Sequence, residues 1–169
     1  CDAFQREHHA DLHRDLAAMV RVKEAAEQAK KELSVTEMTT ISLPLIRTVG
    51  GQAVHLEPTL TRAKFNELTA DLVARTEGPV RSALSDAGIA ASELGKVLLV
   101  GGSTRIPAVQ EKVRQLTGIM PSHSLNPDEC VAMGAAIQGD TLNEHTTLTN
   151  STGLLLLDVT PLSLAIETV

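Results

Sequence analysis

Apolar residues recur at helical spacing in the N-terminal part of the chain. They fall every three or four positions, at Leu12, Leu16, Met19, Val22, Ala26, Ala29 and Leu33. This stripe predicts a long amphipathic helix that begins near residue 12. Residues 1–15 are mostly polar and predict a solvated, fraying helix start. His9 and His13 stand four apart, so on a helix they could hold a metal ion together; surface histidines on the fraying end are the alternative.

Helical spacing then changes to alternation, which predicts two strands. Residues 39–46 alternate as a half-buried strand does, with apolar positions at Ile41, Leu43 and Leu45. Pro44 places this strand at an edge or a bulge, because proline has no amide hydrogen to donate to a ladder. Gly50 and Gly51 predict a hairpin turn. The apolar positions of the return strand are Val54, Leu56 and Leu60.

Two helices follow the hairpin. Thr61 can cap the first of them. Its expected core positions are Phe65, Leu68 and Leu72. Pro79 restarts the helix, and Gly88 is a natural stop because glycine adopts left-handed backbone without strain. The hairpin and the first of these two helices predict a small alpha-plus-beta lobe.

A strand, a glycine turn and a helix form the centre of the chain. The apolar run 97–100 is rich in branched residues and predicts a strand buried on both faces. Gly101 and Gly102 follow, where the lack of side chains lets the backbone turn tightly and lets a flat or anionic ligand approach. Pro107 then opens a helix, whose apolar positions are Ile106, Val109, Val113 and Leu116.

The C-terminal part begins with a strong helix start. In the run 126–129, asparagine caps, proline occupies the first turn and the acidic residues suit the helix N-terminus. The helix after it is rich in small residues, which allow close approach of another backbone: Ala132, Gly134, Ala135, Ala136 and Gly139. Residues 140–153 have no periodicity and predict a connector. Four consecutive leucines, 154–157, then predict the start of a buried strand.

Composition narrows the possible partners. A net charge of -6, with two Phe and neither Trp nor Tyr, disfavours nucleic acid, which needs a basic face and aromatic platforms. Cys1 and Cys130 form neither a disulfide framework nor a metal set, and we expect a reducing cytoplasm. No apolar run reaches membrane-spanning length, so we expect no membrane partner. A chain that starts at Cys1 instead of Met is expected to be partial.

Four segments carry a family resemblance, and they read KEAAEQAKKELS, VLLVGGSTRIPAVQ, NPDECVAMGAA and GLLLLDVTPLSL. Together they resemble the ATPase domain and interdomain linker of the DnaK-type seventy-kilodalton heat-shock chaperones. The resemblance implies an α/β, actin-like ATPase fold, of which this chain would be part of the second lobe. Its expected parts are a small alpha-plus-beta subdomain (1–75), part of the base subdomain with the adenosine-binding glycine turn (76–140), and a connector, the linker and the first strand of the peptide-binding domain (141–169).

The resemblance also implies a set of adenosine contacts. Glu27 and Lys30 would hydrogen-bond the ribose hydroxyls, and Ser34 would meet the adenine edge. Arg105 would stack its planar guanidinium on the adenine ring. The whole expected set is Glu27, Lys30, Lys31, Ser34, Gly101, Gly102, Ser103, Arg105, Ile106 and Asp128. Simpler roles stay open for the two acids, because Glu27 also forms a surface pair with Lys31, and Asp128 also suits a helix N-terminus.

The function implied is an ATP-dependent molecular chaperone that couples ATP hydrolysis to the binding of unfolded peptides through a leucine-rich linker. The linker residues are Leu154, Leu155, Leu156, Leu157 and Asp158. ATP or ADP is the implied cofactor, with Mg²⁺ expected only in the intact parent, and a J-domain co-chaperone and a nucleotide exchange factor are the implied partners. The resemblance implies that the family's phosphate and Mg²⁺ loops would lie upstream of Cys1, so we expect neither catalytic nor metal-binding residues here and no hydrolysis by this chain alone. The alternative is a noncatalytic nucleoside-binding or interaction module.

Overall fold

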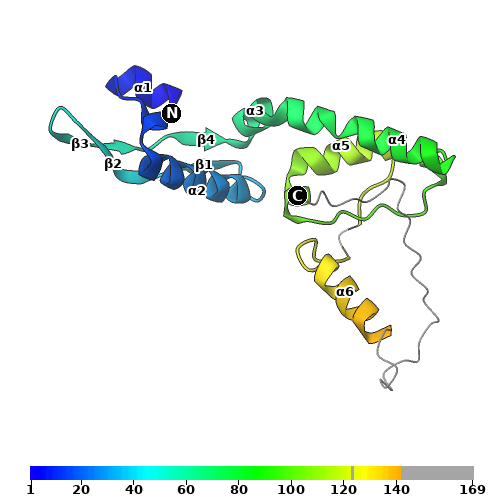
Figure 1. Cartoon of the computed structure of the whole chain (residues 1–169). Helices are drawn as coiled ribbons and strands as arrows, with labels where there is room; N and C mark the ends of the chain where they lie inside the picture. The colour runs from blue at the N-terminus through cyan, green and yellow to red at the C-terminus, as the bar shows by residue number, and fades with distance from the viewer. Residues whose placement is uncertain (123, 142–169) are drawn as a thin grey trace, which may run out of the picture.

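The computed structural model describes residues 1–122 and 124–141, and it has the mixed α/β character that the sequence predicts (Figure 1). The α-helices are α1 (Asp2–His8), α2 (Leu16–Glu32), α3 (Arg62–Arg75), α4 (Glu77–Ala87), α5 (Pro107–Thr117) and α6 (Cys130–Thr141). The strands are β1 (Met38–Thr40), β2 (Leu43–Val49), β3 (Gln52–Leu56) and β4 (Thr59–Thr61). Short 3-10 helices are η1 (Leu12–Arg14), η2 (Ala91–Glu93) and η3 (Gly102–Arg105).

The hydrophobic core lies between the N-terminal helices and the β2–β3 hairpin. Phe4 of α1 and Leu12 of η1 are almost completely buried, and they pack with Ala18 of α2 and with Leu43 and Ile46 of β2. The prediction of a solvated, fraying start over residues 1–15 is therefore wrong. Two large apolar side chains in that polar stretch fill the space between α2 and the hairpin.

The helix α2 begins later than the apolar stripe predicts. Asp15 caps it, because its carboxylate accepts a hydrogen bond from the Ala18 amide at 3.0 Å. Leu16 consequently points to solvent and is 83% exposed, whereas Leu12, in the preceding turn, is 0% exposed. The buried positions at the other end of the stripe, Ala29 and Leu33, are as predicted.

The β2–β3 hairpin confirms the predicted glycine turn. Gly50 and Gly51 have φ angles of 58° and 80°, the left-handed backbone that a tight hairpin turn requires. The sequence predicts Leu60 on the same return strand, and this is wrong. Leu60 lies in β4, opposite Thr39 of β1, in a separate antiparallel sheet. The predicted strand 39–46 is likewise divided between β1 and β2.

An irregularity in β2 lies where Pro44 predicts a bulge. The pairing register with β3 shifts there, and Leu45 has a φ of 50°. Arg21 of α2 donates hydrogen bonds to the carbonyls of Pro44 and Leu45, at 2.7 and 3.2 Å. Because the bulge interrupts the alternation, Ile46 is buried in place of Leu45, which the sequence predicts on the buried side.

Helices α3, α4 and α5 form the next part of the structure, where α3 contacts both α4 and α5 (Figure 1). The Thr61 hydroxyl accepts from the Lys64 amide at 3.1 Å, so the predicted cap of α3 is confirmed. Gly88 ends α4 with a φ of 66°, also as predicted. The start of α4 is at Glu77, two residues before Pro79.

The apolar face predicted for α3 is only partly buried. Leu68 and Leu72 are more than half exposed, so their assignment to the core is wrong. The helix instead turns Phe65, Thr69 and Val73, which are half-buried, toward its neighbours. One of these three positions, Thr69, is polar. The inward face of α3 is therefore not a purely apolar stripe, and the spacing of apolar residues alone predicted the wrong face.

Residues 97–100 do not form the predicted buried strand. Leu98 makes one parallel bridge, to Ser122, and Leu98 and Val100 are about half exposed. A strand buried on both faces belongs to a sheet whose two faces are covered by other elements, whereas within the described residues Leu98 pairs with Ser122 alone, in a single bridge.

The helix α6 begins at Cys130, later than the start predicted at Asn126, and residues 127–129 form a turn in which the Asn126 side chain accepts from the Asp128 amide at 3.2 Å. The close backbone approach expected along this helix is not found among the described residues, because a Cβ at Gly134 or Gly139 would meet no atom within 4 Å. In the part of the chain that the structure describes, no helix combines the length and apolar character needed to cross a membrane. The predicted linker, residues 154–158, lies outside the described residues.

Two leucines of the predicted stripe test this core. Leu12→Ala should lower the free energy of unfolding by about 2–5 kcal/mol, the range for cavities left by buried leucines. Leu16→Ala is the matched control and should change it by less than about 0.5 kcal/mol, because surface substitutions have little effect. Urea denaturation followed by circular dichroism measures both. Equal effects of the two substitutions would contradict the described start of α2.

Candidate functional site

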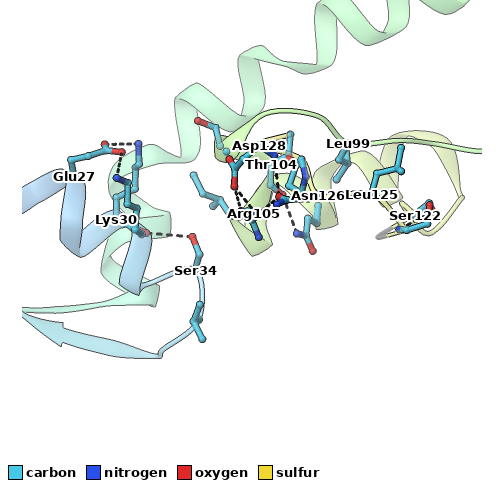
Figure 2. A pocket seen from close by; sticks show the side chains of 18 residues that line it. Glu27, Lys30, Ser34, Leu99, Thr104, Arg105, Ser122, Leu125, Asn126 and Asp128 are labelled. Carbon is cyan, nitrogen blue, oxygen red and sulfur yellow. Dashed lines mark hydrogen bonds and ion pairs between the residues drawn. The ribbon is translucent and has the colours of Figure 1, made fainter. Parts of the chain in front are cut away.

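A pocket of about 970 Å³ lies between the C-terminal end of α2 and the glycine turn of η3. Figure 2 shows Glu27, Lys30 and Ser34 on the α2 side, with Arg105 and Asp128 facing them from the other side. The structure brings nine of the ten sequence-predicted contacts to this pocket: Glu27, Lys30, Lys31, Ser34, Gly102, Ser103, Arg105, Ile106 and Asp128. Gly101 is not part of the lining. Residues far apart in the sequence therefore share one cavity, and their role in binding stays a prediction.

The α2 wall of the pocket carries charge and hydrogen-bonding groups on successive turns. The Glu27 carboxylate pairs with the Lys30 ammonium at 2.6 Å and lies 4.0 Å from that of Lys31. The simple surface pair considered from the sequence is thus present, but it is closest with Lys30. The Ser34 hydroxyl donates to the Lys30 carbonyl at 3.4 Å, which keeps this side chain beside the helix end.

The hydrogen bond from Lys30 lowers the pKa of the Glu27 carboxyl below its ordinary value of 4.5, and the positive charges of Lys30 and Lys31 add to this effect. Glu27 is therefore ionised at neutral pH. A lowered pKa means that the pair stabilises the folded state above the ordinary pKa, and that this contribution is lost as the pH falls through the lowered value. The pair is largely exposed, so its stabilising effect is small.

The glycine turn is fixed by backbone bonds. Gly101 has a φ of 92°, which favours glycine, and its amide donates to the Pro127 carbonyl at 2.8 Å. The Thr104 hydroxyl donates to the Gly101 carbonyl at 2.6 Å, and the Gln110 side chain donates to the Thr104 carbonyl at 2.9 Å. The turn is consequently tied both to the loop before α6 and to the first turn of α5.

Arg105 is held by two side chains of the loop before α6. Its Nε and Nη2 atoms donate to one oxygen of Asp128, at 2.9 and 2.6 Å, and Nη2 also donates to the Asn126 side chain at 2.7 Å. Bonds from two of its three nitrogens, to two different side chains, fix the plane of the guanidinium. A planar cation held in this way can stack on a flat aromatic ligand.

Gly102 matters for space, whereas Gly101 is the glycine of this turn with a left-handed φ. A Cβ at this position would lie 2.9 Å from the second oxygen of Asp128, closer than real contacts allow. The carboxylate that pairs with Arg105 thus occupies the volume that a side chain would take. Asp128 acts here as the partner of Arg105, beyond the helix-terminus role left open by the sequence.

Several lining residues carry no strong sequence signal. Ser122 and Ser124 belong to the segment between α5 and α6, where no periodicity or motif distinguishes them. Asn126 has a recognisable signal as a helix cap, but its bond to Arg105 depends on the tertiary fold. Gln110 lies one turn into α5, and its only sequence signal is that it is a polar residue on the helix that follows the glycine turn.

The histidine pair considered from the sequence does not share a helix face. α1 ends at His8, His9 has a left-handed φ of 51°, and the His13 ring lies 2.9 Å from the Asp11 carboxylate. Among residues 1–122 and 124–141, no group of three or more His, Cys, Asp or Glu side chains is arranged to hold a metal ion.

A comparison with models of protein families matches the whole chain. Residues 1–169 fit the family described as Hsp70 protein. The match covers the pocket residues as well as the helices and strands that carry them.

The contact between Gly102 and Asp128 predicts a coupling between two substitutions. Gly102→Ala should lower the free energy of unfolding by about 1 kcal/mol, because the new methyl group displaces a carboxylate held by Arg105. In an Asp128→Ala background the same substitution should cost almost nothing. Gly134→Ala is the control: it has open space and, in a helix, should stabilise by up to about 1 kcal/mol. Urea denaturation of the four variants measures these changes in the free energy of unfolding. If Gly102→Ala lowers that free energy equally in the wild-type and Asp128→Ala backgrounds, the described contact is contradicted.

The lowered pKa of Glu27 is directly measurable. Titration of its side-chain carboxyl by NMR should give a pKa below 4.5. Lys30→Met should return it toward the ordinary value, since the hydrogen bond from Lys30 is the main cause of the shift. Lys112→Met removes a cation that pairs with Glu77 and should leave Glu27 unchanged. A Glu27 pKa that is insensitive to Lys30→Met would show that the pair does not form in solution.

Proposed function

The chain belongs to the Hsp70 family, and from this premise we propose that its pocket binds the adenosine part of ATP or ADP. Members of this family have an ATP-dependent chaperone ATPase domain that binds adenine nucleotides. The proposal assigns to the chain the adenosine-binding half of such a domain, within the second lobe of an actin-like fold. Residues 1–75 would form the small subdomain, 76–140 part of the base, and 141–169 the connector and linker.

The observation that carries the proposal is the fixed guanidinium of Arg105 opposite the polar end of α2. Three hydrogen bonds to Asp128 and Asn126 hold Arg105 in place before any ligand binds, which lowers the entropic cost of stacking. Across the pocket, Ser34 can meet the adenine edge. Lys30, about one helical turn before Ser34, offers a donor, and Glu27, about two turns before it, offers acceptors, which suits the two ribose hydroxyls.

The same geometry argues against a Mg²⁺ centre in these residues. The two carboxylates that line the pocket, Glu27 and Asp128, are both paired with basic side chains. Mg²⁺ prefers free oxygen ligands in octahedral arrangement, so the residues described here do not fit it. We propose that the phosphates and Mg²⁺ are held elsewhere in the intact parent, and that this chain alone binds nucleotide without hydrolysis.

A role in contacting partners is the second candidate, and the surface of α6 favours it. Val131 and Ile137 are more than half exposed on this helix, directly after the loop that holds Arg105. Exposed apolar side chains that gather on one surface can mark a contact with another protein. In the intact parent we propose unfolded peptides, a J-domain co-chaperone and a nucleotide exchange factor as partners, and a cytoplasmic location.

The nucleotide proposal predicts base selectivity that depends on Arg105. Isothermal titration calorimetry should give tighter binding of ADP than of GDP. Arg105→Lys keeps the charge but loses the plane, so ADP affinity should fall by about 0.5–2 kcal/mol, which is about 2- to 30-fold. Arg114→Lys is the matched control, since Arg114 lies on α5 and pairs with Glu111 at 2.7 Å, outside the pocket lining.

Equal affinity for ADP and GDP would refute an adenine site. Unchanged ADP binding by Arg105→Lys would refute stacking while leaving the site intact. Steady release of phosphate from ATP, at a rate proportional to protein concentration, would contradict the proposed lack of hydrolysis.

A further inference from the structure

We propose that Arg62, at the start of α3, is a positioning residue for the adenine pocket: it holds the segment after α2 that carries Ser34. This inference rests on the proposed adenine site. Arg62 does not line the pocket, and it would act through the backbone that it binds.

The Arg62 side chain bridges both ends of a five-residue segment, 33–37. Its Nε donates to the Leu33 carbonyl at 2.7 Å, and its Nη2 donates to the Thr36 carbonyl at 2.8 Å. Its Nη1 donates to the Glu37 carboxylate at 2.5 Å. The side chain is only 18% exposed. Ser34 and Val35, both pocket residues, lie between the two carbonyls that Arg62 binds.

The bond to Leu33 satisfies a buried carbonyl that the helix itself leaves without a partner. The last carbonyls of a helix have no partner in the helix itself, and the chain after α2 continues in tight turns that use those of Lys31 and Glu32. Leu33 is buried, so water has poor access to its carbonyl. A guanidinium provides several donors in one plane and can bond both carbonyls at once, whereas an ammonium is a point donor.

The β1–β4 pairing brings Arg62 to this place. Met38 lies opposite Thr61 at the end of the small sheet, and the Arg62 amide donates to the Glu37 carbonyl at 2.8 Å. Thr61 then caps α3, so the chain turns into the helix beside the end of α2. Two strands of three residues are weakly stable alone, which leaves the side-chain bonds of Arg62 to fix the junction.

α3 also reaches the opposite wall of the pocket. It packs against α5, whose first residue follows the turn that carries Arg105 (Figure 1). Arg105 itself is held by the loop before α6, independently of Arg62. Loss of the Arg62 bonds should therefore move Ser34 while Arg105 stays fixed. The expected consequence is weaker recognition of the adenine edge with stacking preserved.

The test is a double-substitution cycle on base selectivity. The ratio of ADP to GDP affinity is measured by calorimetry for the wild-type chain, Arg62→Ala, Ser34→Ala and the double variant. Arg62→Ala and Ser34→Ala should each reduce the ratio about three- to tenfold, the effect of about one hydrogen bond. The double variant should show no further loss. Arg75→Ala, at the exposed far end of α3, should leave the ratio unchanged.

Amide hydrogen exchange gives a readout that needs no ligand. Exchange at Ser34, Val35 and Thr36 should be at least several-fold faster in Arg62→Lys than in the wild-type chain, and unchanged in Arg75→Ala. Arg62→Lys keeps the positive charge but loses the planar group of donors. It replaces Arg62→Ala in the affinity measurements if that variant does not fold.

The outcomes separate the two proposals. Independent, multiplicative losses in the double variant, an unchanged ratio in Arg62→Ala, or unchanged exchange at residues 34–36 would overturn the role of Arg62. A wild-type chain that binds no ADP would refute the adenine site instead, and the exchange rates would still decide whether Arg62 holds the segment.

Discussion

Burial of the inner face of α2 is the constraint on which the rest of the site depends. Ala18, Ala29 and Leu33 are sealed from solvent, and Leu12 and Phe4 fill the space beside the helix. Each large apolar side chain that is buried in this way contributes about 1.5–3 kcal/mol. The buried face fixes the rotation of the helix about its axis. Its other face then presents Glu27, Lys30 and Lys31 to the pocket without any cost to the core.

Electrostatic pairing shapes the pocket without leaving bare charge in it. Both of its carboxylates have a cationic partner within hydrogen-bond distance, Lys30 for Glu27 and Arg105 for Asp128. Exposed pairs of this kind are weak, so they add little to stability. Their effect is geometric, because they hold side chains in a preferred direction before a ligand arrives. The Gly102 backbone completes this arrangement by leaving room for the Asp128 carboxylate.

Burial is distributed unevenly along the described chain. The fully buried apolar side chains lie between Phe4 and Ile46, whereas the helices α3 to α6 keep many apolar residues half exposed or more. Caps, turns and polar bonds hold these helices in place. One example is the hydrogen bond that the Lys112 ammonium of α5 donates to the Glu77 carboxylate of α4 at 2.6 Å. Such contacts fix local geometry well but supply little hydrophobic stabilisation. Exposed apolar surface of this extent is typical of surfaces that contact other proteins or domains.

Several features could be predicted from the sequence alone, because they depend on residues that are close together in the chain. The glycine hairpin turn, the Thr61 cap, the Gly88 stop and the helix after Pro107 depend on backbone preferences within a few residues, and all are found. The family resemblance also predicted a set of site residues, and the fold brings nine of these ten residues to one pocket. Motifs achieve this because they record residues that act together even when they lie far apart in the chain.

Tertiary structure alone decided which apolar residues are buried and how the site is held. Spacing could not tell Leu12 from Leu16, because the Asp15 cap shifts the start of α2 and packing by α1 covers only one of them. It could not show that residues 97–100 lack flanking strands, since pairing depends on what else reaches that edge. The bonds from Arg105 to Asn126 and from Arg62 to Leu33 join segments more than twenty residues apart. No local pattern encodes such contacts, because they exist only once the helices and strands have packed.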